Sequence, residues 1–290
     1  MKLCTVWSVV VFVLFVSVSS VFAASPVWKI SKGDARIYVG GTIHVLSKTD
    51  YPLPAGFDAA YQQAAQLVFE TDMQKMAAPE TRQLLLQQVV YTDGRNLKQV
   101  LKQQTFQELE TFLADKKVPV AGVVGLKPGM LAVTLTMLEL QRLGMGEAGV
   151  DSFYQAQALN DHKRLGQLEA VEEQIGFLAS LGKGYENELI SYTLRDIKDL
   201  PRIMPLIKAA WRQGDLQKLE ELALVPLKQE FPPIYQTLIV KRNKAWLPRI
   251  EAMLKNADVE FVLVGALHLV GEDGLLAQLA ARGYQIQKLD

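Results

Sequence analysis

The segments "YVGGTIHVL" (38–46) and "LVGALHLVG" (263–271) lie near opposite ends of the chain and share one pattern. In each, an apolar run is followed by a glycine, two further residues and a histidine. His44 and His268 are two of only three histidines among 290 residues. An apolar run ending in glycine predicts a buried strand whose end allows close approach of backbone or ligand. In an open α/β sheet, ligands gather beyond the carboxyl ends of the strands, where we expect both histidines.

The patterns beside these segments predict an α/β fold. "VWKI", a turn at "KGD" and "RIYVG" predict a hairpin, "DAAYQQAA" a helix and "QLVFETD" a strand. Strand, helix and strand in this order predict a βαβ unit with a parallel pair. The chain closes with an expected strand "VEFVLVGALHL", a helix "GLLAQLAARG" and a strand "YQIQKLD".

The middle of the chain predicts helices. Apolar residues recur at helical spacing over 79–117, with a break near Asp93, and 185–256 is almost wholly helical in pattern. In that second stretch we expect breaks at Pro201, Pro205, Gly214, Pro232, Pro233 and Pro248. Between the two stretches, a helix from Asp151 and a short strand "RLGQLE" are expected. The fold class is therefore α/β, with a mixed or mainly parallel sheet from N- and C-terminal strands and a large central helical insertion.

The segment "GMLAVTLTMLELQRLG" (129–144) is apolar on most faces. It is shorter than the roughly 20 residues that span a bilayer. A buried helix is expected, with a hairpin that dips into a membrane as the alternative.

Residues 1–23 combine Lys2, an apolar run and a small-residue cleavage site after Ala23, which predicts a secretory signal peptide. We expect a periplasmic or secreted protein with one domain over 24–290. The alternative is an uncleaved anchor, and membrane association is expected only in that case. Cleavage removes Cys4, the only cysteine, which excludes disulfides, a catalytic thiol and a zinc-thiolate site.

Lysine plus arginine and aspartate plus glutamate each number 31, giving a formal net charge of zero. No basic stripe stands out, so a nucleic acid is not an expected partner. The chain also lacks the HExxH, GxSxG, phosphate-loop and dinucleotide-binding motifs.

Three expected strand ends carry His44, Glu70 and His268. Two imidazoles and a carboxylate suit a divalent metal that keeps positions open for water and substrate. Mn²⁺, Fe²⁺, Co²⁺ and Zn²⁺ are all compatible with this set. A lone histidine after a strand is usually structural, but the matched context of this pair favours function. His162, in the polar run "NDHKRLG", is expected at the surface.

Four further residues are candidates with simpler alternatives. Asp151 is either a site residue or the N-cap of its helix. Glu169, at a strand end, is a possible fourth ligand or general base. Arg242 and Asn243 could bind a carbonyl or carboxylate oxygen, whereas Arg242 is otherwise a surface cation.

These motifs together resemble the TraB/GumN family (the TraB/PrgY/GumN group), which is related to the Tiki metalloproteases. The resemblance rests on "GTIH" (41–44), "FETD" (69–72) and "GALH" (265–268), and on "GVD" (149–151), "LEAVEEQ" (168–174), "RN" (242–243) and "GEDGLLAQLAARGY" (271–284). It extends from about residue 27 to the end. Lys241 departs from the pattern, because an acidic residue is expected before the Arg-Asn pair.

The resemblance implies a metal-dependent hydrolase of the peptidase type, with both GxxH histidines and Glu70 at its active site. It also suggests a core like that of erythromycin esterase and the haem-binding ChaN proteins. His44 and His268 would bind the metal, Glu70 would be a ligand or the base, and Arg242 and Asn243 could stabilise an oxyanion. The substrate would be a peptide or a small molecule. Two alternatives stay open: a metal-independent, esterase-like hydrolase with a histidine base, and a non-enzymatic protein that binds a peptide or haem.

Overall fold

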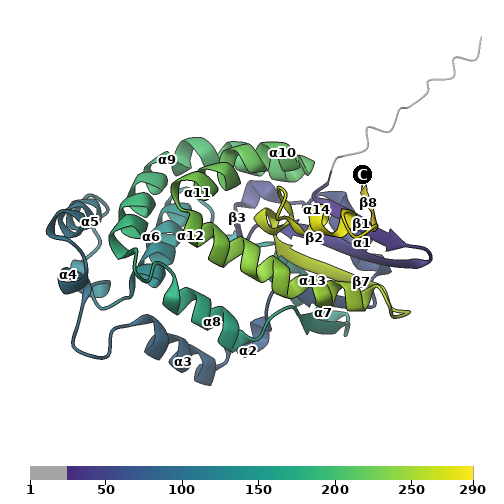
Figure 1. Ribbon diagram of the computed structural model, residues 1–290, viewed down its shortest axis with the longest axis horizontal. Helices are drawn as coiled ribbons and strands as arrows, with labels where there is room; N and C mark the ends of the chain where they lie inside the picture. The colour runs from purple at the N-terminus through teal and green to yellow at the C-terminus, as the bar shows by residue number, and fades with distance from the viewer. Residues whose placement is uncertain (1–24, 290) are drawn as a thin grey trace, which may run out of the picture.

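The computed structural model describes residues 25–289, so the expected signal segment and Cys4 lie outside the described residues. A six-stranded sheet has the strand order β6-β4-β7-β2-β1-β8 (Figure 1). Its strands are β1 (Val27–Lys32), β2 (Ala35–Thr42), β4 (Gln66–Phe69), β6 (Arg164–Gln167), β7 (Glu260–Gly265) and β8 (Gln285–Lys288). A second sheet pairs β3 (Val45–Leu46) with β5 (Glu147–Ala148).

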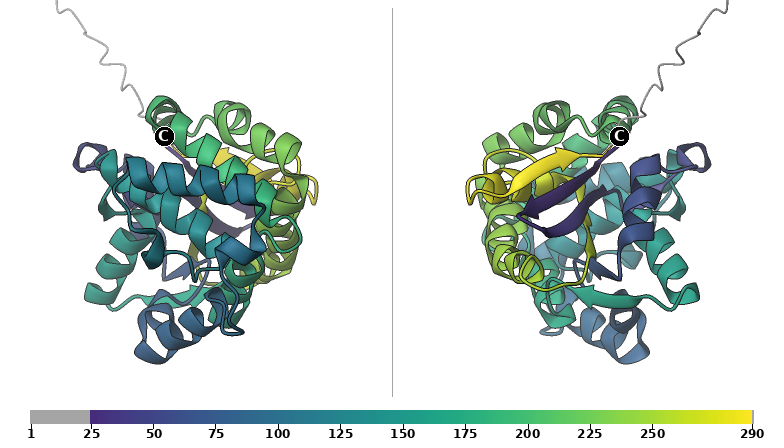
Figure 2. Two further views of the ribbon diagram at one scale, coloured as in Figure 1. Left: turned by 90° about the vertical axis from the view of Figure 1, so that its left-hand side faces the viewer. Right: turned by 90° about the vertical axis from the view of Figure 1, so that its right-hand side faces the viewer.

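The six-stranded sheet is mainly parallel, as expected. Neighbouring strands from β6 to β2 are parallel, whereas β1 is antiparallel to both β2 and β8. The predicted hairpin of β1 and β2 is confirmed, and β8 lies beside β1 in the right-hand view of Figure 2. Strands β2 and β4 are parallel but not adjacent, because β7 lies between them. Residues 260–264 of β7 are all buried, which suits a strand covered on both faces.

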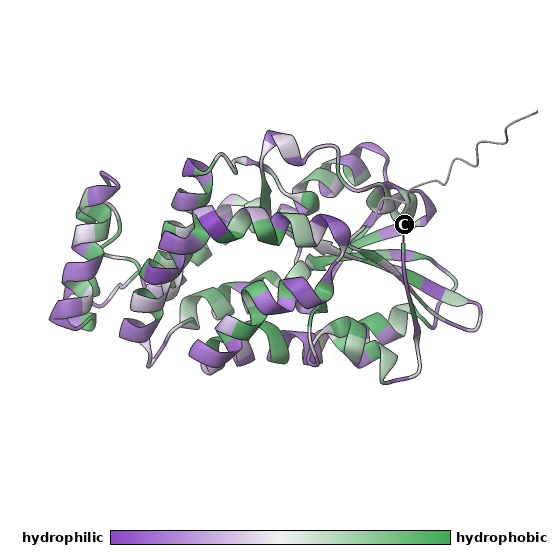
Figure 3. Ribbon diagram, turned by 90° about the horizontal axis from the view of Figure 1, so that it is seen from above, coloured by the Kyte–Doolittle hydropathy of each residue, from purple (hydrophilic) through white to green (hydrophobic). Residues whose placement is uncertain are grey.

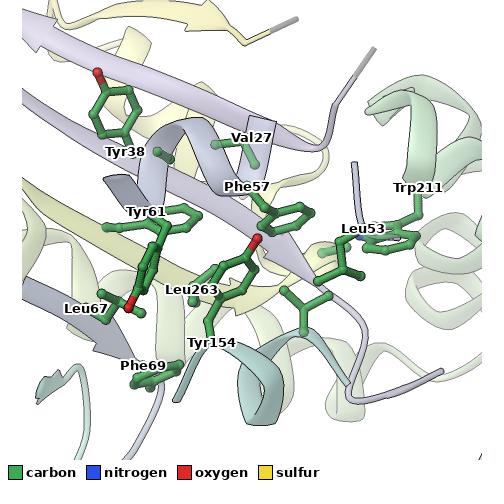
Figure 4. Close-up of a cluster of buried hydrophobic side chains, with 14 of the residues drawn as sticks. Val27, Tyr38, Leu53, Phe57, Tyr61, Leu67, Phe69, Tyr154, Trp211 and Leu263 are labelled. Atoms are coloured by element: carbon green, nitrogen blue, oxygen red, sulfur yellow. The ribbon is translucent and has the colours of Figure 1, made fainter. Parts of the chain in front are cut away.

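Successive residues of β7 contribute to the cores on opposite faces of the sheet. Phe261 and Leu263 join one hydrophobic cluster, and Val262 and Val264 join the other. The first cluster is covered by α1 (Ala55–Gln63) and α7 (Val150–Asn160), and Figure 4 shows side chains of these helices gathered around Leu263. The second is covered by α13 (Lys241–Met253) and α14 (Leu275–Ala280). The sheet is therefore the middle layer of a three-layer fold.

The helical insertion comes in two blocks, because β6 returns to the sheet between them. The first block follows β4 and holds α2 (Met73–Ala77), α3 (Pro79–Val89), α4 (Leu97–Val100), α5 (Gln103–Asp115) and α6 (Pro128–Arg142). The second precedes β7 and holds α8 (Val171–Ser180), α9 (Glu186–Gln213), α10 (Leu216–Leu219), α11 (Val225–Glu230) and α12 (Pro232–Tyr235), with π-helical segments η3 (Glu220–Leu224) and η4 (Gln236–Val240) leading to α11 and α13. Both blocks lie on one side of the sheet, and Figure 3 shows apolar and hydrophilic residues alternating along their helices.

The first block and α9 share a separate hydrophobic core, to which α5, α6 and α9 contribute. Helix α6 packs against α9 and is the expected buried helix of the apolar segment. Among residues 25–289, no helix has the length and apolarity needed to cross a membrane.

Two local predictions were wrong. Helix α9 continues through Pro201 and Pro205, and α13 continues through Pro248. A proline removes one helical hydrogen bond, and burial of the apolar face of each helix outweighs that loss. Strand β7 ends at Gly265, and Ala266–Leu269 forms a 3-10 turn, η5, instead of continuing the strand.

Candidate functional site

The carboxyl ends of four parallel strands meet at one edge of the sheet. Thr42 of β2 pairs with Gly265 of β7, and Phe69 of β4 pairs with Leu263 of β7. The residues that follow these ends are His44, Glu70, Glu169 and His268. With Asp151, Arg242 and Asn243 we call these seven residues the sheet-edge cluster. The structure therefore brings every sequence-predicted candidate into one region.

The absence of a side chain on Gly265 leaves a space at the centre of this cluster. A Cβ atom built on Gly265 would lie 3.3 Å from Oε1 of Glu70, 3.7 Å from Nε2 of His44 and 3.7 Å from Cδ2 of His268. The two histidines and the glutamate thus face a common point, although they come from opposite ends of the chain.

The side chain of His44 contacts Asp151, and the two residues are brought together by close packing of their backbones. Val45 of β3 pairs with Ala148 of β5, and the Val150 amide donates to the carbonyl of Ile43. A Cβ on Gly149 would lie 2.2 Å from the carbonyl carbon of His44, so glycine is required there. This approach places Nδ1 of His44 2.9 Å from Oδ2 of Asp151.

Asp151 is consequently not an N-cap. Gly149 precedes helix α7, and the Asp151 carboxylate is used on the imidazole. Its charge stabilises the protonated form and raises the pKa of His44 to about 9. Nδ1 therefore carries a proton toward Asp151, and Nε2 is turned to the space beside Gly265 on a side chain that is 65% exposed.

His268 is held by Asn243 instead. The Asn243 amide donates to the carbonyl oxygens of His268 and Asp273 at 3.0 and 2.8 Å, so its Oδ1 is an acceptor. Oδ1 lies 2.7 Å from Nδ1 of His268, which must therefore be the protonated nitrogen. Burial lowers the pKa of His268 to about 3, so the ring is neutral with a lone pair on Nε2.

Arg242 connects the buried members of the cluster. Its Nη2 donates to Glu70 at 2.6 Å and to Glu169 at 2.7 Å, and its Nε also donates to Glu169. Its Nη1 lies 3.1 Å from Nε2 of His268 and donates to that lone pair. Arg242 is therefore buried and paired, not a surface cation, whereas Lys241 beside it is exposed.

Glu70 is ionised at neutral pH. Burial opposes its charge, but His268, Arg242 and the Gly265 amide, which donates to Oε1 at 2.7 Å, lower the pKa of Glu70 to about 2. With Glu169 and Asp151 the cluster holds three carboxylates against two cations, Arg242 and protonated His44, so one negative charge remains.

The donor chemistry fits a divalent metal. Each histidine has its Nδ1 fixed by a second group, which is the usual arrangement of metal-binding imidazoles. An ion would displace the proton that Nε2 of His44 carries at neutral pH, since the pKa of this ring is about 9. Within residues 25–289, however, no three His, Cys, Asp or Glu side chains are already arranged as ligands of one ion. Arg242 donates to the lone pair of His268, so this contact would be replaced when His268 binds an ion.

Trp246 is the site residue that the sequence reasoning missed. Its ring lies 4.5 Å from that of His268, and its Nε1 donates to Glu169 at 3.1 Å. It follows Arg242 by four residues on α13, so both side chains share one helix face. That spacing is the signal that could have found it. His162, by contrast, is exposed and outside the cluster, as expected.

Two cavities open at the cluster. One, of about 380 Å³, extends under α9, η3 and η4, and the other, of about 460 Å³, lies against α2, α3 and α8. Both are lined by His44 and Glu70.

The fold and cluster define a class: an α/β protein with a helical insertion that carries two GxxH histidines and a glutamate at one sheet edge. Residues 26–288 match the model of the TraB/PrgY/gumN family, so the chain belongs to that family. Comparison with curated proteins and with solved structures gave no match.

Proposed function

We propose that the protein is a metal-dependent hydrolase of the peptidase type, with His44, His268 and Glu70 as metal ligands. The observation that carries the proposal is the matched pair of imidazoles. Each has Nδ1 fixed by a neighbour, and both rings lie with Glu70 around the space beside Gly265. A divalent ion would also offset the excess negative charge of the cluster. Family membership agrees with this reading, and the proposed setting, periplasmic or secreted, rests on the N-terminal sequence pattern alone.

The residues around the proposed metal have separate roles. When bound, the ion would polarise the scissile carbonyl and make water nucleophilic at neutral pH. Asp151 and Asn243 fix the tautomers of the two histidines. Glu70 suits the ligand role over the base role, because its pKa of about 2 makes it a weak base, and each oxygen accepts a single bond, from the Gly265 amide or Arg242, and keeps a second lone pair.

Arg242 brings the positive charge that would stabilise a developing oxyanion. Glu169 accepts from Arg242 through both oxygens and therefore orients the guanidinium, which leaves it poorly placed as a ligand or base. Asn243 uses both amide protons on backbone carbonyls, so its contacts favour positioning His268 over binding substrate.

One observation favours a second candidate, a metal-independent hydrolase. Nε2 of His44 is on an exposed side chain backed by Asp151, and Nε2 of His268 is already bonded to Arg242. His44 would then be the general base toward water, with Asp151 orienting it; because the pKa of His44 is about 9, its neutral form and the activity would increase toward alkaline pH.

The test uses protein purified without chelators or a histidine tag. Metal content is measured by elemental analysis, and cleavage of a quenched fluorogenic peptide library is followed with and without EDTA. His44→Ala and His268→Ala should each lower bound metal and reduce kcat/KM about a hundredfold or more. His162→Ala, at the exposed third histidine, is the matched control and should change neither.

Activity that survives EDTA but is lost in His44→Ala selects the metal-independent candidate. Equal metal content and equal activity in all four proteins would end both. Tight peptide binding without turnover in Mn²⁺, Co²⁺ or Zn²⁺ selects the binding protein.

A further inference from the structure

The first cavity at the sheet-edge cluster has almost wholly apolar walls. It lies between the end of β2, α6, α9 and the two π-helical segments, and Met137, Met204, Ala223 and Leu238 contribute to its walls. Its charged or ionisable residues are His44, Glu70, Arg242 and His268, which all belong to the cluster. Beyond the reacting centre, this cavity offers no charged side chain to a ligand.

The second cavity has the same character but is built from other elements. Met73, Met76, Ala77 and Leu178 of α2 and α8 line it, together with Phe69 and Leu85. Its ionisable residues are His44, Glu70 and Asp151, again members of the cluster. Its helices, α2, α3 and α8, differ from α6 and α9 of the first cavity, although both blocks of the insertion contribute to each cavity (Figure 1).

His44 and Glu70 are the residues that line both cavities. The reacting centre therefore lies where two apolar spaces meet. A ligand that fills both must carry an apolar group on each side of a polar, reactive group. An ester of a fatty acid and a small alcohol carries only one such group. A peptide bond between two large apolar residues carries both.

The lining also indicates how selective each cavity is. Two methionines lie in each cavity, Met137 and Met204 in one and Met73 and Met76 in the other. Methionine is unbranched and adapts its shape to what it packs against. Burial of a large apolar side chain in such walls is favourable, and burial of a charged one is strongly unfavourable.

We propose that the substrate is a peptide chain cleaved between two large apolar residues, one accepted by each cavity. The inference rests on the proposed hydrolase function for the cleavage step, but the binding preference stands apart from it. Met, Leu and Phe are expected at both positions, and Asp, Glu, Lys and Arg are excluded.

The experiment compares fluorogenic peptides that differ only in the two residues flanking the expected bond. Ala77→Leu partly fills one cavity and Ala223→Leu the other; Ala277→Leu, at an exposed position on α14, is the matched control. Binding is measured by fluorescence anisotropy in EDTA, and cleavage is measured separately with Mn²⁺.

Wild-type protein should bind peptides with two large apolar residues about tenfold or more tightly than peptides with alanine at either position. Ala77→Leu should abolish the preference at one position and Ala223→Leu at the other, while Ala277→Leu keeps both. Selective binding without cleavage would count against the hydrolase and the cleavage step, and would leave the binding preference of the two cavities standing. Three outcomes would overturn the inference. The first is cleavage with no preference for apolar residues, and the second is that both variants affect the same position. The third is a preference for long-chain p-nitrophenyl esters over every peptide.

Discussion

The two GxxH segments share a sequence pattern, yet their histidines lie in opposite surroundings. The side chain of His44 is 65% exposed and contacts a carboxylate, whereas that of His268 is 6% exposed and lies between Trp246, Asn243 and Arg242. The pKa of His44 is raised to about 9 and that of His268 lowered to about 3. The end of a strand therefore determines where an imidazole lies, while residues from other elements determine its charge.

The buried histidine, His268, contacts Arg242. Replacing Arg242 should have the largest effect on the free energy of unfolding. Arg242→Met removes the cation shared by Glu70 and Glu169 and leaves two buried carboxylates uncompensated. Breaking a buried ion pair in this way should cost about 3–5 kcal/mol in the free energy of unfolding, measured with urea.

Arg195→Met is the control for this prediction. Arg195 pairs with Glu230 at the surface, with side chains 62% and 48% exposed. Its loss should change the free energy of unfolding by about 1 kcal/mol at most. An equal loss of unfolding free energy in Arg242→Met and Arg195→Met would show that Arg242 does not stabilise the buried residues of the cluster.

A smaller effect is expected when the support of His268 is removed. Asn243→Ala leaves Nδ1 of His268 without its acceptor and two buried carbonyl groups without a donor. The free energy of unfolding should fall by about 1–3 kcal/mol. Asn256→Ala, at an exposed asparagine that donates to Glu260, is the comparison and should cost less. Urea unfolding curves that reverse this order would contradict the assigned role.

A pH dependence of opposite sign is expected at the two histidines of metal-free protein. The unfolded pKa is near 6.5 for both, and the folded pKa of His44 is about 9. The stabilisation from His44 is therefore complete below about pH 6.5 and lost as the pH rises through 9. The folded state holds His268 neutral down to about pH 3, so its contribution is lost as the pH falls from 6.5 toward 3.

The measurement is the free energy of unfolding between pH 4 and 9.5, compared between wild type and variants. Asp151→Asn removes the main cause of the raised pKa and should flatten the alkaline slope alone. His162→Gln, outside the cluster, should follow the wild type at every pH. An alkaline slope that persists in Asp151→Asn would refute the pairing of Asp151 with His44.

Much of the fold was predictable because its signals are local. The β1–β2 hairpin, β4, β6 and the helix–strand end of the chain follow from apolar runs, turn residues and helical spacing. The course of α9 through two prolines was not predictable, because tertiary burial offsets the lost hydrogen bonds. The position of β7 between β2 and β4 was also not predictable from the sequence, since strand order depends on contacts between distant segments.

The candidate site likewise contains residues that the sequence could predict and residues that it could not. His44, Glu70, Glu169 and His268 were predictable as residues that follow expected strands. Trp246 was not, because nothing in its own neighbourhood marks it apart from its spacing to Arg242. The choice of Asp151 as the partner of His44 depends on the pairing of β3 with β5, which joins segments about a hundred residues apart.

Two histidines and a glutamate could be placed at strand ends from the amino-acid sequence, because apolar runs closed by glycine and acidic residues are local signals. The folded arrangement was needed to learn which histidine is buried and neutral and which is exposed and paired with a carboxylate. Charge state depends on desolvation and on neighbouring charges, and both come from elements that meet only after the chain has packed.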